Sequence, residues 1–303
     1  MNNGFSDELN DLITNKTTQP RPVSALSLHK YIQEYNHITK VLGKSGDWIT
    51  NDPTYKLVNI INAMDSSASN RLNYLNIFIM IRKTSNDLQT LLDLRDRLNK
   101  RKSVEIKEKI QNLKETLPTY EEVNKYINEL YTNRQYVDYL INYFIWTYGL
   151  RNRDVNLSII NLNDFNKNDT SKNWIVIRKV DVILYISNYK TAGAYGLKKI
   201  ICRSRKVLDA CNKLGVGNLI TNKFNEPVDD NGISYYINLY DNLNESEYYK
   251  IKINHLQTQP NPIQQIAKLC ETRGSCNIST LNNHYNINTK PKGRVNPPVN
   301  NNL

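Results

Sequence analysis

A short stretch near the middle of the chain combines residue types that could bind a phosphate. Gly149, Leu150 and Arg151 follow a long apolar segment, and Asp154 comes three residues later. Because a guanidinium presents a rigid fork of donors, Arg151 could hold a phosphate through two hydrogen bonds. A helix that ends in glycine before an ordinary surface arginine would give the same pattern. These residues alone leave both interpretations open.

The elements before Arg151 explain how it would be positioned. The apolar pattern predicts a helix over 136–148, and a second amphipathic helix over 121–131 precedes it. Upstream, Pro118 breaks the preceding helix, Thr119 can cap a helix N-terminus, and Glu122 stands where a capping box needs an acid. We therefore expect a new domain to begin near residue 116.

Residues 25–115 predict a separate, all-helical unit. Apolar residues recur at helical spacing from Leu28 to Val41, and Gly43 ends that run. Three more helices are predicted, over 52–61, 70–82 and 85–98. The charged segment 100–114 predicts an exposed helix or a linker, and its lysines fit a solvated face as well as a DNA contact.

After Asp154 the apolar period changes to two, which predicts strands. The expected strands are 156–159, 174–177, 182–186 and 199–202, with a hairpin loop over 188–196. Helices are predicted again over 206–214, 232–243, 245–257 and 263–270, with a short one near 278–285. The predicted fold class is therefore α+β, mostly helical, with a small antiparallel sheet.

Charge and composition indicate the partner. The 303 residues carry a formal net charge of +11 and have a pI near 9.3. Such a balance favours a polyanionic partner, double-stranded DNA first, although a basic protein without one is the alternative.

Other classes of function find little support. The four cysteines include no CxxC pair, so reduced thiols are favoured over a metal site. There is no apolar leader at the N-terminus and no run of 18 apolar residues, which predicts an intracellular protein that is neither secreted nor embedded in a membrane. Nothing indicates a small-molecule cofactor.

The order of these features resembles the tyrosine recombinase or phage integrase family over residues 25–287. The resemblance implies a flexible arm (1–24), a SAM-like core-binding domain that contacts DNA (25–115), a recombinase-like catalytic domain (116–287) and a basic disordered tail (288–303). Within the family, the Tyr-Lys-Thr sequence at 189–191 and Thr-Arg-Gly-Ser at 272–275 look closest to integrase-like proteins of large DNA viruses. A viral protein, in the infected cell or the virion, is the corresponding expectation.

The resemblance also implies a chemistry. In the family, a tyrosine hydroxyl attacks a DNA phosphodiester to give a 3′-phosphotyrosyl link, arginines stabilise the phosphate charge, and a hairpin lysine protonates the leaving oxygen without a metal. Arg151 matches the first arginine and Tyr285 the nucleophile. Lys190 matches the hairpin lysine, with Lys198 and Lys199 as alternatives because hairpin length varies.

Two positions depart from the family pattern. The His-x-x-Arg motif is best matched by Tyr249 and Lys252, and a lysine keeps the charge but loses the fork. Arg273 is the other candidate for the missing guanidinium. The family's later His or Trp falls near Cys276, where neither type is found.

Two functions consequently remain open. One is a recombinase or integrase that acts as a homo-oligomer on DNA. The other is a catalytically degenerate, recombinase-like protein that binds DNA or has a structural role in a virion. Whether the chain is an enzyme is not decided by the sequence.

Overall fold

The structure is a computed structural model that describes residues 25–82, 85–114, 116–230 and 232–274. The chain divides into two compact units, residues 1–109 and 110–303. The predicted arm (1–24), the helix near 278–285 and the basic tail (288–303) lie outside the described residues. The assignment of the two units as DNA-binding and catalytic domains stays a prediction.

In its described part, the first unit consists of helices around one apolar core. The helices are α2 (Ala25–Val41), α3 (Trp48–Asn51), α4 (Thr54–Ala63), α5 (Ala68–Ile81) and α6 (Leu88–Lys114). Trp48 packs edge-on against Phe78, with ring centroids 5.5 Å apart, and Leu57, Leu75 and Leu91 are fully buried around them. The predicted helices are confirmed, and α3 is additional. The charged segment 100–114 is helical and continues α6, and the boundary between the two units falls within it.

The second unit begins with the predicted pair of helices, α7 (Tyr120–Thr132) and α8 (Tyr136–Tyr148). The capping box is confirmed: the Glu122 amide donates to Thr119 Oγ1 (3.2 Å), and the Thr119 amide donates to the Glu122 carboxylate (2.7 Å). Later helices are α10 (Arg205–Leu214), α11 (Glu245–Gln257) and α12 (Pro262–Arg273), close to their predicted ranges.

The sheet contains β1 (Leu157–Asn161), β2 (Asn173–Ile177), β3 (Val182–Ile186), β4 (Lys198–Cys202) and the short β5 (Gly217–Asn218), in the order β4-β3-β2-β1-β5. β2, β3 and β4 pair antiparallel, as expected. β1 pairs parallel with β2, so the sheet is mixed rather than wholly antiparallel. The connection between β1 and β2, which includes η2 (Leu162–Asp164), takes the chain back to the end of the sheet where β1 begins. Alternation of apolar residues does not indicate strand direction, so it could not predict this parallel pairing.

Two predicted segments differ from the structure. The predicted helix over 232–243 is wrong: the chain instead forms two short 3₁₀ segments, η3 (Ile233–Tyr236) and η4 (Tyr240–Asn242). Asp241 and Asn242 have φ of 50° and 55°, a left-handed conformation that interrupts a right-handed helix. The predicted hairpin loop contains a short helix, α9 (Ala192–Tyr195), between β3 and β4.

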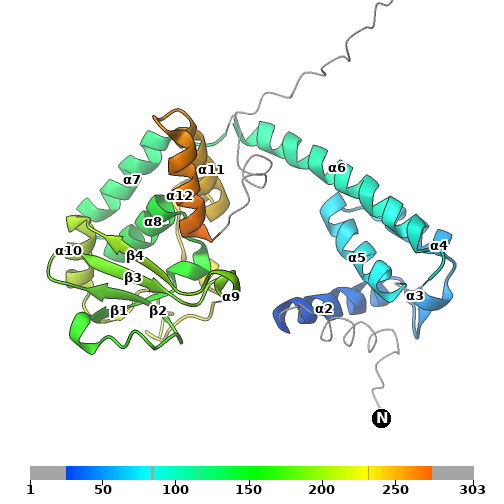
Figure 1. The fold of residues 1–303 in the computed structure, drawn as a ribbon, viewed down its shortest axis with the longest axis horizontal. Helices are drawn as coiled ribbons and strands as arrows, with labels where there is room; N and C mark the ends of the chain where they lie inside the picture. Colours follow the sequence, from blue (N-terminus) through cyan, green and yellow to red (C-terminus); the bar gives the residue numbers. More distant parts are fainter. Residues whose placement is uncertain (1–24, 83–84, 115, 231, 275–303) are drawn as a thin grey trace, which may run out of the picture. The chain divides into compact units, whose positions relative to one another are not determined.

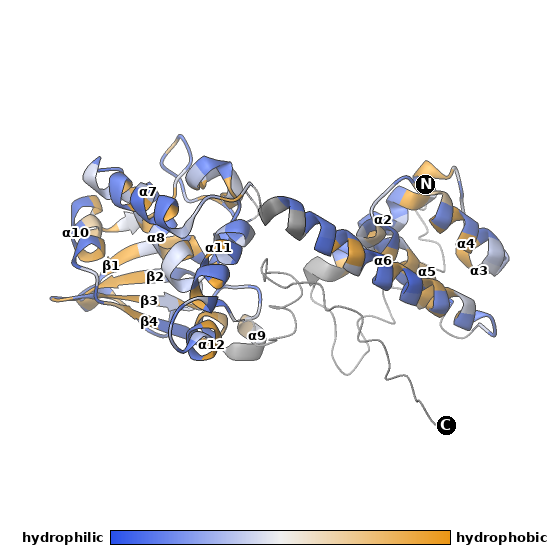
Figure 2. Ribbon diagram, turned by 90° about the horizontal axis from the view of Figure 1, so that it is seen from above, coloured by the Kyte–Doolittle hydropathy of each residue, from blue (hydrophilic) through white to orange (hydrophobic). Residues whose placement is uncertain are grey.

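The core of the second unit lies between α8 and the sheet. Phe144, Leu150, Val155, Ile175 and Leu184 are all fully buried in it, and Figure 2 shows hydrophobic residues concentrated along the strands. This core fixes both the end of α8 and the β3–β4 hairpin, the two places from which the candidate site is built. None of the described helices is long and apolar enough to cross a membrane.

Candidate functional site

Arg151 is positioned by the sharp end of α8. Gly149 caps that helix in a left-handed conformation (φ 66°), and a Cβ there would lie 3.0 Å from the Tyr249 ring and 3.1 Å from Leu269. Glycine therefore lets α8 end against both α11 and α12. The chain then enters the 3₁₀ segment η1 (Asn152–Val155), with Arg151 at its start.

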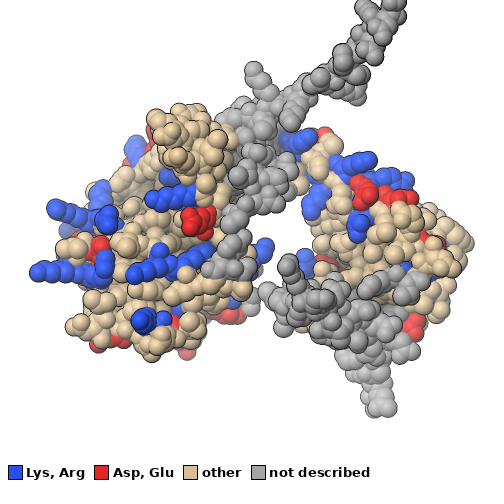
Figure 3. Space-filling model, viewed as in Figure 1, with Lys and Arg blue, Asp and Glu red and all other residues tan. Residues whose placement is uncertain are grey.

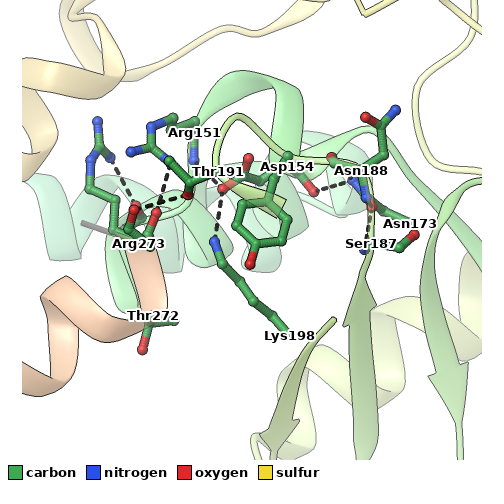
Figure 4. Close-up of polar contacts among 12 residues, drawn as sticks. Arg151, Asp154, Asn173, Ser187, Asn188, Thr191, Lys198, Thr272 and Arg273 are labelled. Atoms are coloured by element: carbon green, nitrogen blue, oxygen red, sulfur yellow. Dashed lines mark hydrogen bonds and ion pairs between the residues drawn. The ribbon is translucent and has the colours of Figure 1, made fainter. Parts of the chain in front are cut away.

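The Arg151 side chain extends to the end of α12. Its Nη1 donates to the Arg273 carbonyl oxygen at 2.7 Å (Figure 4). The side chain is half-buried rather than enclosed. Because a guanidinium has five donors, this contact holds the fork in place while other donors can serve a ligand.

Lys198, the first residue of β4, lies on the other side of this site. Its Nζ is 3.8 Å from Asp154 Oδ2 and 3.6 Å from the centre of the Tyr189 ring. The side chain is only 10% exposed, and its Nζ has no hydrogen-bond partner among the described residues. A buried ammonium without a hydrogen bond is costly, which is typical of a group kept for a ligand or a proton transfer.

Burial lowers the pKa of Lys198 to about 8. The attraction of Asp154 opposes this shift, and repulsion from Arg151 and Arg273 adds to it. Burial also raises the pKa of Asp154, against the attraction of Lys198 and the hydrogen bond that the Arg151 amide donates to its carboxylate (3.3 Å). Lys198 can therefore exchange a proton near neutral pH.

Arg273 lies beside these residues, but its fork is held by the fold. Nη1 donates to the Gly149 carbonyl (2.8 Å), Nη2 donates to Glu245 Oε1 (3.0 Å), and the guanidinium lies 4.4 Å from the Tyr249 ring centre. The residue is 3% exposed. In this arrangement Arg273 joins the ends of three helices, α8, α11 and α12, under Arg151.

The chain turns sharply after Arg273. Gly274 is left-handed (φ 69°), and a Cβ there would lie 2.7 Å from Thr191 Oγ1 and 3.2 Å from Lys198 Nζ. Thr191 Oγ1 donates to the Gly274 carbonyl at 3.0 Å. A glycine at this position therefore allows α12 to end directly against the β3–β4 hairpin.

The structure places Lys252 away from the cluster of Arg151, Lys198 and Arg273. It lies seven residues after Glu245 on α11, about 10 Å further along the helix axis. Its Nζ is 3.3 Å from the Tyr120 hydroxyl and lies over the rings of Tyr120 and Trp146, at 5.0 and 5.3 Å from their centres. These contacts place Lys252 in an aromatic cluster.

The remaining predicted residues fall in two groups. The Lys190 side chain is exposed, whereas Lys198, the alternative, is the hairpin lysine in contact with Asp154. Tyr285 and Cys276 lie outside the described residues. Among the residues that the structure describes, no group of His, Cys, Asp or Glu has the composition to hold a metal ion.

Several residues of the site were not predicted as site residues: Tyr189, Thr191, Glu245 and Gly274. Tyr189, Thr191 and Gly274 fall within the two short sequences that carried the family resemblance, and Gly274 also had a local signal, because glycine commonly ends helices. Glu245 looks like an ordinary acid in the first turn of a helix, and its contacts are made by residues distant in the sequence.

Comparisons with known proteins give one structural similarity. No protein-family model matches the chain. No curated protein sequence matches it either. The crystal structure of XerA recombinase is similar with a TM-score of 0.35 and 12% sequence identity, and the match covers 92% of each chain.

Proposed function

We propose that the second unit binds duplex DNA and holds one backbone phosphate between Arg151 and Lys198, for strand cleavage of the tyrosine recombinase type. The observation that carries this proposal is the Lys198 ammonium, which is buried and without a hydrogen-bond partner among the described residues, beside Arg151. A phosphate oxygen would supply the missing acceptor. The cluster holds three cations, Arg151, Lys198 and Arg273, and two carboxylates, Asp154 and Glu245, so a single anionic phosphate fits its charge.

Each residue has a distinct role in this proposal. Arg151 grips the non-bridging oxygens and stabilises their charge in the transition state. Lys198, with a pKa of about 8, donates a proton to the leaving 5′ oxygen. Asp154 keeps the ammonium in place, and Arg273 positions Arg151 through its carbonyl group.

The nucleophile in this proposal is Tyr285, on the strength of the family resemblance. The bond between phosphorus and the tyrosyl oxygen forms as the bond between phosphorus and the 5′ oxygen breaks. The tyrosyl proton leaves to water, and the 5′ oxygen takes the proton of Lys198. The products are a 3′-phosphotyrosyl link and a 5′-hydroxyl end.

A suicide substrate tests the chemistry. Nicked duplexes that lose a short strand after cleavage trap the covalent protein–DNA adduct, which is scored on a denaturing gel. A library of nicked duplexes removes the need to know the target site. We expect an adduct from the wild type and none from Tyr285→Phe, with DNA affinity nearly unchanged. If the wild type gives no adduct with any duplex, the enzymatic proposal is wrong.

The surface of the second unit supports binding to DNA. Figure 3 shows Lys and Arg side chains over the part of this unit where Figure 1 draws β4 and α10. Lys199, Arg203, Arg205 and Lys206 are exposed there. For binding that depends on phosphate contacts, the logarithm of the affinity falls linearly with the logarithm of the salt concentration. Arg203→Ala should lower that slope by about 1, whereas Lys125→Ala, on α7 and paired with Glu129, should not.

A second function is favoured by the state of Arg273. Its fork is occupied by Gly149 and Glu245, and Lys252 lies in the aromatic cluster, so neither offers a second bidentate grip on phosphate in this arrangement. A protein that binds DNA without cutting it, as a homo-oligomer or as a structural component of a virion, fits that observation. Salt-dependent binding without any adduct would select this function.

A further inference from the structure

We infer that Asn173 is a positioning residue that fixes the β3–β4 hairpin against the segment carrying Arg151 and Asp154. This inference deepens the proposed function and rests on it for its catalytic meaning. Asn173 is the first residue of β2, is 2% exposed, and pairs with Leu157 at the start of β1. It therefore lies at the start of the central strand of the sheet.

The Asn173 side chain joins two backbone segments through four hydrogen bonds (Figure 4). Its Nδ2 donates to the carbonyl oxygens of Asp154 (3.3 Å) and Asn188 (3.0 Å). Its Oδ1 accepts from the amides of Ser187 (3.0 Å) and Asn188 (2.8 Å). An amide side chain has two donors and two acceptor lone pairs, so all of its capacity is used on the backbone.

These bonds act on the site from both sides. One anchors the carbonyl of Asp154, whose carboxylate faces Lys198. The other three anchor the first residues after β3, immediately before Tyr189, whose ring lies under the Lys198 ammonium. Without this link, the distance between Lys198 and Asp154 would depend on the packing of two irregular segments, η1 and the residues after β3.

The neighbouring Asn188 extends the link. Its Oδ1 accepts from Arg153 Nη2 (2.5 Å), and its Nδ2 donates to Asp230 Oδ2 (2.9 Å). Asp230 in turn pairs with Arg153 at 2.9 Å. The polar chain from Asn173 therefore reaches Arg153, next to Asp154, which joins the two halves of the proposed site through a second route.

A residue that only stabilised β2 would have no effect on the titration of Lys198. Asn218 provides the matched control, because its Oδ1 accepts from Ser158 Oγ (2.8 Å) on the same sheet, away from Lys198. The variants to compare in the full-length chain are Asn173→Ala, Asn173→Ser and Asn218→Ala. Asn173→Ser adds no charge and leaves a hydroxyl too short to bridge the two segments, so it tests the link even if Asn173→Ala does not fold.

The readout is the pKa of Lys198, measured by NMR on protein with isotope-labelled lysine and assigned with Lys198→Arg. We expect the Asn173 variants to lower it below about 8, because a displaced Asp154 attracts the ammonium less, and Asn218→Ala to leave it unchanged. The adduct yield of the Asn173 variants should fall at least about tenfold with unchanged DNA affinity. An unmoved Lys198 pKa in Asn173→Ser would overturn the inference. Because this measurement needs no catalysis, it decides the role of Asn173 even if the wild type forms no adduct.

Discussion

Two lysines of the second unit lie near aromatic rings and differ in almost every other respect. Lys198 lies over Tyr189, is nearly enclosed, and has no hydrogen-bond partner among the described residues. Lys252 lies over Tyr120 and Trp146, is half-buried, and donates to the Tyr120 hydroxyl. Both positions were candidates from the sequence.

This difference distinguishes a cation that stabilises the fold, Lys252, from one that can bind a ligand or transfer a proton, Lys198. The Lys252 charge is already stabilised by two rings and a hydroxyl, so its contacts explain its presence. The Lys198 charge is buried beside two other cations, which lowers its pKa, and Asp154 only partly compensates. A fold retains such a group at a cost in stability, and the proposed phosphate site explains that retention.

The largest expected effect is the loss of cleavage in Lys198→Ala. Removal of a general acid costs about 10²–10⁴ in rate, whereas Lys252→Ala should change the rate by less than about tenfold, since it removes only packing. The measurement is single-turnover adduct formation on the same nicked duplex.

A modified substrate separates proton donation from packing. If the 5′-bridging oxygen is replaced by sulfur, the leaving thiolate needs no proton, because thiols are far stronger acids than alcohols. Lys198→Ala should then regain a rate close to that of the wild type. Failure of this rescue, with the fold intact, would contradict the role of Lys198 as proton donor.

The next effect concerns the close approach of α12 to Lys198. Gly274→Ala would place a Cβ 2.7 Å from Thr191 Oγ1 in a left-handed conformation. We expect destabilisation of about 2–4 kcal/mol, from about 1 kcal/mol of backbone strain and about 1–3 kcal/mol of overpacking. Gly215→Ala at the end of α10 is the control, since Gly215 also has a positive φ (76°) but has no atom within 4 Å of the added Cβ. Equal shifts of the two urea midpoints would show that the contact with the hairpin is loose.

A smaller effect is the pH dependence of cleavage. Lys198 carries its proton below its pKa of about 8, so adduct formation should be constant below that pH and fall about tenfold per unit above it. Lys198→Arg, which does not titrate in this range, should remove the break in the profile.

The free energy of unfolding should show the opposite trend and increase with pH. The pKa of Lys198 is lower in the folded chain than in the unfolded one, so the neutral form favours folding. The stabilising contribution of this group is fully present above the unfolded value of about 10.4 and is lost as the pH falls through about 8. The difference in unfolding free energy between wild type and Lys198→Met, measured from pH 7 to 10, isolates this contribution.

Local signals in the sequence predicted much of this architecture. The capping box at Thr119, the glycine that ends α8 and the ranges of α8 and α11 depend on neighbouring residues, and these predictions are confirmed. The parallel pairing of β1 with β2 and the break at Asp241 depend on the path of the chain, which apolar periodicity does not encode.

The site shows the same limit. Arg151 was found because it follows a helix-ending glycine. The choice between Lys190 and Lys198 depends on α9, a short helix in the hairpin that changes which lysine meets Asp154. Arg273 and Glu245 meet only in the folded chain, 28 residues apart in sequence, and no local pattern marks such a pair.

The smallest expected effect is in the aromatic cluster of Lys252, and it provides the sharpest test of the comparison. Lys252→Met removes a cation from two rings, which is worth about 0.5–1 kcal/mol at a partly exposed position. Tyr120→Phe removes the hydroxyl that Lys252 contacts at 3.3 Å and should cost about 1 kcal/mol or less. Because the two residues touch, the double variant should lose less than the sum of the single losses.

A double-mutant cycle from urea unfolding measures this coupling, and the adduct assay is run on the same proteins. A purely structural Lys252 predicts a measurable coupling with Tyr120 and cleavage that is nearly unchanged. Strong loss of cleavage in Lys252→Met, with Tyr120→Phe active, would instead show that Lys252 leaves the aromatic cluster when DNA binds. The sequence-based assignment of Lys252 to the second arginine's place would then hold, and Lys252→Arg should increase the rate because it restores the bidentate fork.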